Sequence, residues 1–100
     1  MSADLEEAKV EIKGINILEE ALNKNNGKDA IISISHILYG SQKIKCQLDN
    51  IFDDKRIGFT VKTGQEIYIY REDIVDFGIE DGIYFADRLM KVNVKLINAV

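Results

Sequence analysis

Residues 44–79, IKCQLDNIFDDKRIGFTVKTGQEIYIYREDIVDFGI, contain the pattern that decides the fold. Apolar and polar side chains alternate there in four short runs, which are separated by turns containing Asp or Gly. Alternation with a period of two between such turns is typical of half-buried antiparallel strands. The positions that it predicts to face inward are Ile44, Cys46, Leu48, Ile57, Phe59, Val61, Ile67, Ile69, Val75, Phe77 and Ile79. We therefore predict a mainly β fold built from short strands.

The alternation is interrupted in the segment 49–52. Ile51 and Phe52 are adjacent apolar residues, so their side chains fall on opposite sides of the strand. An inserted residue of this kind indicates a β-bulge, which bends its strand sharply. Because such a bend lets a small sheet curl toward closure, we predict a strongly bent five-stranded antiparallel barrel.

An N-terminal helix is predicted over residues 4–25. Its apolar residues recur at spacings of three and four, which draws a single apolar stripe: Leu5, Ala8, Ile12, Ile15, Leu18 and Leu22. Asp4 and Glu7 have the spacing of a capping box, and Asn26-Gly27 provides a left-handed end. The helix either lies on the sheet or caps one open end of the barrel.

The flanks of the central stretch contain further strand candidates. Residues 30–39 carry apolar side chains on both faces, which indicates burial on both faces. Residues 90–96 alternate well, whereas residues 83–86 fit either another strand or a loop. We therefore predict one domain over residues 1–100, with a helix (4–25), barrel strands (30–80) and a C-terminal extension (82–100) that adds a strand.

Composition limits the possible functions. The net charge of −4 means that any nucleic-acid site must be a local basic patch in an unfavourable overall field. The single Cys excludes an internal disulfide. The N-terminus is acidic where a secretory signal would be basic, and no apolar run approaches membrane-spanning length. We expect a cytoplasmic protein without membrane contact.

Candidate catalytic and metal-binding residues are few. His36 is the only histidine and Cys46 lies on the apolar face of its strand, so we expect structural roles for both. A Cys46–His36 couple on adjacent strands is geometrically possible, but no third group orients it. Asp53-Asp54 lacks the spacing of a calcium loop. We expect no enzymatic activity, no metal and no cofactor.

The most informative side chains are aromatic and basic. Tyr68 and Tyr70 share the outward face of one strand, and Arg71 follows directly. Aromatic rings stack on bases, and arginine contacts phosphate or stacks in turn. The more ordinary alternative is that both tyrosines pack on a neighbouring subunit or on the C-terminal tail.

A helix followed by five short strands with a bent second strand, over residues 4–80, resembles the layout of the Sm-like (LSm/Hfq-type) family of small β-barrels. Residues 43–48 followed by Phe52-Asp53 are similar to the family's second strand and turn, and residues 67–75 to its fourth strand, one-turn connector and fifth strand. In Hfq-type proteins the connector between the fourth and fifth strands has a His where this chain has Glu72. The resemblance implies a homo-oligomeric ring, in which Glu66–Tyr70 pairs with Ile74–Ile79 of the next subunit.

The resemblance also implies a function. Such a ring would bind single-stranded RNA, and Tyr70, Arg71 and Arg56 are the residues expected to contact it. The alternative is a homo-oligomeric assembly or adaptor protein without a nucleic-acid role, which binds other proteins through its helix face or its tail.

Overall fold

The computed structural model describes residues 14–97, which form a mainly β domain with one N-terminal helix. The helix covers residues 14–24. The other elements are β1 Asp29–His36, β2 Gly40–Gln47, β3 Asn50–Phe52, β4 Arg56–Thr60, β5 Glu66–Tyr70, a 3-10 turn η1 Arg71–Asp73, β6 Asp76–Gly78, β7 Ile83–Ala86 and β8 Met90–Leu96. The predicted strand alternative for residues 83–86 is therefore the correct one, and the one-turn connector after β5 is present.

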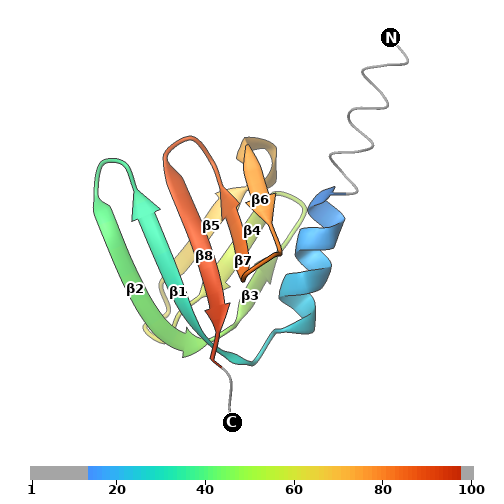
Figure 1. Cartoon of the computed structure of the whole chain (residues 1–100), viewed down its shortest axis with the longest axis vertical. Helices are drawn as coiled ribbons and strands as arrows, with labels where there is room; N and C mark the ends of the chain where they lie inside the picture. Colours follow the sequence, from blue (N-terminus) through green and yellow to red (C-terminus); the bar gives the residue numbers. More distant parts are fainter. Residues whose placement is uncertain (1–13, 98–100) are drawn as a thin grey trace.

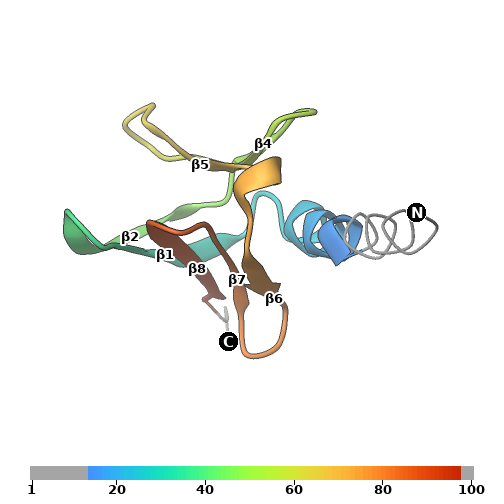
Figure 2. The same cartoon turned by 90° about the horizontal axis from the view of Figure 1, so that it is seen from above.

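The strands form two antiparallel sheets that face each other (Figures 1 and 2). The large sheet has the order β2-β1-β8-β7-β6, and the small sheet has the order β3-β4-β5. Strand β2 passes into β3 through Leu48 and Asp49, so one bent segment of chain contributes to both sheets. The predicted bend lies at this point.

The predicted closed barrel of strands between residues 30 and 80 is not what the described residues form. Within residues 14–97, the backbone pairing of the large sheet ends at β2 and β6, and that of the small sheet ends at β3 and β5. The segment expected as an extension instead supplies the centre of the large sheet, because β8 lies between β1 and β7. Val92 and Val94 of β8 are fully buried, so this strand belongs to the core.

The hydrophobic core fills the space between the sheets and one side of the helix. Its fully buried members come from all three layers: Ile32, Phe85, Val92 and Val94 from the large sheet, Ile57 and Phe59 from the small sheet, and Leu18 and Leu22 from the helix. The rings of Phe59 and Phe85 join the two sheets at a centroid distance of 6.0 Å. The inward alternation predicted for β2, β4 and β5 is confirmed by this burial.

The helix lies at the side of the two sheets (Figure 2), next to β3 (Figure 1). The Asn50 side chain donates a hydrogen bond to the Leu22 carbonyl (2.7 Å), and the Asn26 side chain accepts one from the Asn50 amide (3.0 Å). Gly27 follows with φ +85°, as the left-handed helix end requires. The predicted helix residues 4–13, including the Asp4–Glu7 capping box, lie outside the described residues.

Two predicted inward patterns are wrong. Val75 and Ile79 are 61% and 47% exposed, because β6 is only three residues long and only Phe77 points at the core. The first strand ends at His36, where its Nδ1 accepts hydrogen bonds from the amides of Leu38 and Tyr39 (3.0 and 3.3 Å). That hairpin turn leaves residues 37–39 exposed instead of buried.

No helix among the described residues is long and apolar enough to cross a membrane.

Candidate functional site

The predicted RNA-binding residues Arg56 and Tyr70 are cross-strand neighbours on the outer face of the small sheet. Together with Tyr68 they form a compact group, which we call the tyrosine cluster (Arg56, Tyr68 and Tyr70). The two tyrosine rings meet edge to face at 5.5 Å, and the Arg56 guanidinium lies 4.9 Å from the centre of the Tyr68 ring. The shared outward face predicted for Tyr68 and Tyr70 is confirmed, and the strand register adds Arg56 to it.

Gly58 makes this cluster possible. It pairs with Tyr68 across the ladder, and a Cβ on Gly58 would lie 2.0 Å from the Ile67 carbonyl oxygen and 2.5 Å from the Tyr68 Cα. Distances of that kind are incompatible with any side chain, so only glycine allows β5 to approach β4 so closely.

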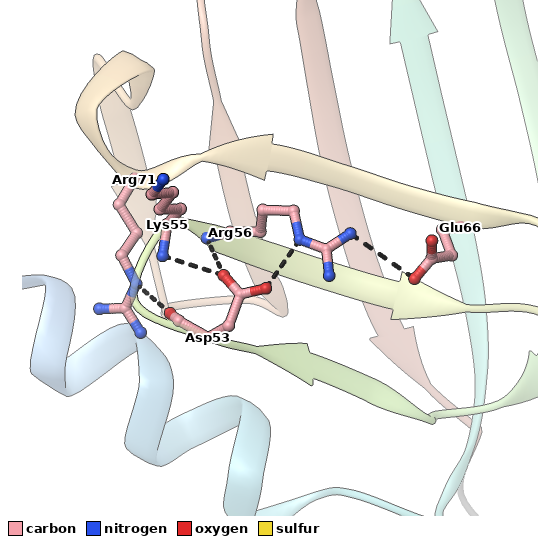
Figure 3. Close-up of polar contacts among 5 residues, drawn as sticks. All are labelled: Asp53, Lys55, Arg56, Glu66 and Arg71. Carbon is pink, nitrogen blue, oxygen red and sulfur yellow. Dashed lines mark hydrogen bonds and ion pairs between the residues drawn. The ribbon is translucent and has the colours of Figure 1, made fainter.

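The charge of Arg56 is balanced by neighbouring carboxylates (Figure 3). Its Nε donates to Asp53 Oδ2 at 2.8 Å, and its Nη1 lies 3.7 Å from Glu66 Oε2. Asp53 Oδ1 also accepts the backbone amides of Lys55 and Arg56, and these hydrogen bonds, with that from the Arg56 side chain foremost, lower the Asp53 pKa to about 2. The tyrosine cluster thus carries little free positive charge for a phosphate.

Arg71 does not join the tyrosine cluster. Its Nε donates to the Asp53 carbonyl at 2.8 Å, its Nη1 forms an ion pair with Glu19 of the helix, and its amide donates to the Lys55 carbonyl. Figure 3 shows this side chain running from η1 toward the helix. Arg71 therefore links the helix, the β3–β4 turn and η1, which is a structural role that sequence analysis missed.

His36 and Cys46 occupy opposite ends of the β1–β2 hairpin. Cys46 pairs with Ala30 and His36 pairs with Gly40, so the two residues are separated by roughly 20 Å along the strands. The predicted possibility of a Cys–His couple is therefore wrong. Cys46 is buried, and burial raises the pKa of its thiol. Within residues 14–97, no group of three or more His, Cys, Asp and Glu side chains is placed to hold a metal ion.

A second surface, which sequence analysis did not single out, lies on the outer face of the large sheet. We call it the lysine face: Lys43 and Lys45 of β2, Lys91 and Lys95 of β8, and the Ser33, Asn93 and Tyr84 side chains between and beside them. All four lysines are exposed. The sequence signal was available, because in both strands the lysines alternate with buried residues, but nothing local showed that the two strands flank the same neighbour, β1.

The backbone register sets the spacing of these lysines. Lys45 and Lys95 are both partners of Ile31, on opposite sides of β1, so their Cα atoms are roughly 10 Å apart. Lys43 lies two residues from Lys45 and pairs with Ser33, which in turn pairs with Asn93. The lysines therefore surround a polar centre instead of lying in a line.

No carboxylate within residues 14–97 forms an ion pair with any of these four lysines. The Lys91 ammonium lies 4.6 Å from the centre of the Tyr84 ring, and Tyr84 donates a long hydrogen bond of 3.4 Å to Asp76. Asp29 lies at one margin of the face, and Asp76 lies at another, in the row of Lys91. Burial and the charges of Asp76 and Glu80 raise the pKa of Tyr84, so these carboxylates are near the Tyr84 end of the face. The lysine face is thus a local basic surface on a chain of net charge −4.

No family model, curated protein or solved structure matches this chain. The likeness to Sm-like proteins therefore rests on the sequence alone, on the order of helix and bent strands over residues 4–80 and on segments 43–48, 52–53 and 67–75.

Proposed function

We propose that this protein is a small module that binds single-stranded RNA on the lysine face. The observation that supports this proposal is the gathering of four exposed lysines, without ion-pair partners in the described part of the chain, on one face of an acidic protein. Phosphate contacts of lysine and arginine supply most of the affinity in nucleic-acid binding. A basic surface that persists against an overall negative charge is the feature that such binding requires.

The side chains between the lysines favour single strands over duplexes. Tyr84 is partly exposed, and a base would replace the Lys91 ammonium over its ring while that ammonium turns to a phosphate. The Asn93 amide and the Ser33 hydroxyl provide donors and acceptors for the edges of unpaired bases. In this arrangement the lysines hold phosphates, Tyr84 stacks a base, and Asn93 and Ser33 contact base edges or ribose hydroxyls.

The fold proposal accompanies this function. We interpret the two facing sheets as an open form of the Sm-like or SH3-like barrel, because the bent β2–β3 segment, the 3-10 turn after β5 and the pairing of β8 with β1 follow that layout. The hairpin of β6 and β7 is then an insertion before the last strand. A cytoplasmic RNA-binding protein without enzymatic activity remains our proposal.

The test is a titration of fluorescein-labelled oligo(U) and oligo(A) 12-mers with the purified chain at 50, 100 and 200 mM salt. With four phosphate contacts to a single strand, the affinity should fall with a slope of about −3 in a double-logarithmic plot, which is roughly a 50-fold loss over this range. The variant Lys43→Gln/Lys45→Gln/Lys91→Gln/Lys95→Gln should bind with a slope near zero.

A matched control variant distinguishes the loss of the lysine face from the change in net charge. Lys24→Gln/Lys28→Gln/Lys55→Gln/Lys62→Gln removes the same number of lysines from the helix end and from turns elsewhere. The control should keep most of the affinity and of the salt slope. Equal losses in the two variants would reject the lysine face as the binding surface, and no binding at 50 mM salt would reject the function.

Self-association through strand edges is the second candidate function. Val75 and Ile79, beside the edge strand β6, are apolar and exposed, and β5 is the free edge of the small sheet. Pairing of Glu66–Tyr70 with Ile74–Ile79 of another copy would cover both residues and build the expected ring or an assembly scaffold. Light scattering should then show an oligomer that Val75→Lys dissociates and that Ile17→Lys, at a similarly exposed helix position, leaves intact. A monomeric mass at 100 μM would exclude this candidate.

A further inference from the structure

An open groove of about 540 Å³ lies between the two sheets. The β1–β2 and β4–β5 hairpins, which supply most of its lining, diverge on the side away from the helix (Figure 2). The apolar side chains that line the groove come from both sheets: Ile34 of β1, Met90 of β8 and Ile67 of β5. Its volume is within the range of sites that bind small ligands or short peptide segments.

Strand edges border this groove. Four consecutive residues of the chain, 65–68, line it, and so do the four consecutive residues 39–42. Three residues of each run belong to a strand, Gly40–Gln42 of β2 and Glu66–Tyr68 of β5. Because side chains of a strand alternate between its faces, three consecutive lining residues indicate that the edge of the strand is turned toward the groove. In the described structure β5 pairs only with β4 and β2 pairs only with β1, so both edges present unpaired backbone N–H and C=O groups.

We propose that this groove binds an extended peptide segment of a partner protein, which adds a strand to the free edge of β5. Main-chain hydrogen bonds to β5 would hold the segment, and its side chains at every second position would enter the apolar space formed by Ile34, Ile67 and Met90. The bound segment would fill part of the gap that keeps the two sheets from closing. This interaction goes beyond RNA binding and uses the inner side of the large sheet, so either activity can be lost without the other.

The charge of the groove determines the chemistry of the partner. Within residues 14–97, Glu66 is the only lining residue with a carboxylate or a cationic side chain, and His36 uses its Nδ1 as an acceptor for the Leu38 and Tyr39 amides. The contact of Glu66 with Arg56 is long (3.7 Å) and the Glu66 side chain is 48% exposed, so this carboxylate can also pair with a cation of the partner. A segment with apolar residues at alternate positions and a Lys or Arg between them is therefore complementary.

The proposal is tested with a display library of random 12-residue peptides, selected on the full chain. We expect enrichment of sequences with alternating apolar residues and at least one basic residue. Gln42→Trp fills the groove from an exposed position of β2, whereas Gln47→Trp places the same side chain at the exposed far end of that strand. Selected peptides should bind Gln42→Trp at least tenfold more weakly than the wild type, and Gln47→Trp as the wild type does.

Hydrogen exchange on the unmodified chain provides a readout that does not depend on a variant. A selected peptide should slow amide exchange in residues 65–68 by at least tenfold. The proposal is overturned if no peptide is enriched, if Gln42→Trp binds the selected peptides normally, or if protection falls outside the groove. It is also overturned if sedimentation shows a dimer of the wild type that Gln42→Trp dissociates, because the groove then receives a second copy.

Discussion

The outer faces of the two sheets both present cationic and tyrosine side chains, but they differ in how the cations are balanced. On the small sheet, Arg56 has carboxylate oxygens of Asp53 and Glu66 within 4 Å. On the large sheet, no described carboxylate forms an ion pair with the four lysines, and the Lys91 ammonium lies over the Tyr84 ring. A basic residue next to an aromatic one is therefore a poor guide to phosphate binding until its acidic neighbours in space are known.

The largest change expected is loss of the small sheet itself, by Gly58→Ala. The new Cβ would collide with the Ile67 carbonyl and with Tyr68, so β5 could no longer lie against β4. We expect the free energy of unfolding to fall by about 3 kcal/mol or more, because overpacking against a backbone cannot be relieved by a rotamer change. Urea denaturation followed by circular dichroism measures this loss.

Ser35→Ala serves as the control for Gly58→Ala, since Ser35 is exposed on the lysine face and its side chain makes only a long contact of 3.5 Å with Ser41. Its effect should stay within about 0.5 kcal/mol. If Gly58→Ala were equally mild, the close approach of β4 and β5 would not be the constraint that builds the tyrosine cluster.

A smaller effect on stability, and none on RNA affinity, is expected for Arg71→Met. The Arg71 and Glu19 side chains are only 26% and 25% exposed, and Arg71 also donates to the Asp53 carbonyl. Loss of this link should lower the free energy of unfolding by about 1–2 kcal/mol.

Arg88→Met is the matched change at an exposed arginine of the β7–β8 turn and should be close to neutral. If Arg71 is a structural residue, Arg71→Met should have a lower melting temperature than Arg88→Met. The two variants should bind oligo(U) with equal affinity in anisotropy titrations. A large loss of RNA affinity in Arg71→Met alone would return this residue to the binding surface.

Asp53→Asn should change how stability depends on pH. The folded-state pKa of Asp53 is lowered from 3.8 to about 2, so its ionised form is favoured by folding. That stabilisation is fully present above about pH 4 and disappears as the pH falls from about 4 to about 2. Over this interval the urea midpoint of the wild type should therefore fall more than that of Asp53→Asn.

The control for this pH effect is Asp54→Asn, which removes one carboxylate from the same turn. The difference between Asp53→Asn and the wild type should be greatest near pH 6 and smallest near pH 2. Parallel pH profiles for Asp53→Asn and the wild type would mean that the hydrogen bonds from Arg56 and the two amides do not stabilise the ionised carboxylate.

The smallest effect is expected for RNA binding by Arg56→Gln/Tyr70→Ala. Because the charge of Arg56 is already balanced, this double variant should change oligo(U) affinity by less than about twofold and leave the salt slope intact. A loss of oligo(U) affinity as large as that of the four-lysine variant would instead place the RNA on the outer face of the small sheet.

Much of the fold was predictable because strand alternation is a local property. Buried Cys46, Leu48, Phe59 and Ile69 follow from the period of two, and Gly27 ends the helix as expected. The wrong burial predictions lie where a strand is very short or where a turn interrupts the alternation. Val75 and Ile79 alternate correctly, yet β6 is too short to bring their side chains to the core.

The candidate sites were less predictable, for a related reason. The shared outward face of Tyr68 and Tyr70 follows from strand alternation, whereas the pairing of Arg56 with Tyr70 depends on the register of the β4–β5 hairpin and was not predicted. The ion pair of Arg71 was not predicted because Glu19, its partner, is 52 positions earlier in the chain and on another element. The lysine face was missed because its two halves come from β2 and β8, which only long-range pairing places on either side of β1.

By itself, the sequence determined the type and approximate limits of most strands, the bend between β2 and β3, the end of the helix and the acidic overall charge. These features depend on side-chain periodicity, turn chemistry and composition, which act over a few residues. Only the tertiary structure decided that β8 lies at the centre of the large sheet, that Arg71 is held by the helix and that four lysines share one open face. Those outcomes depend on which distant segments bury their apolar faces together, and the same local patterns are compatible with several such arrangements.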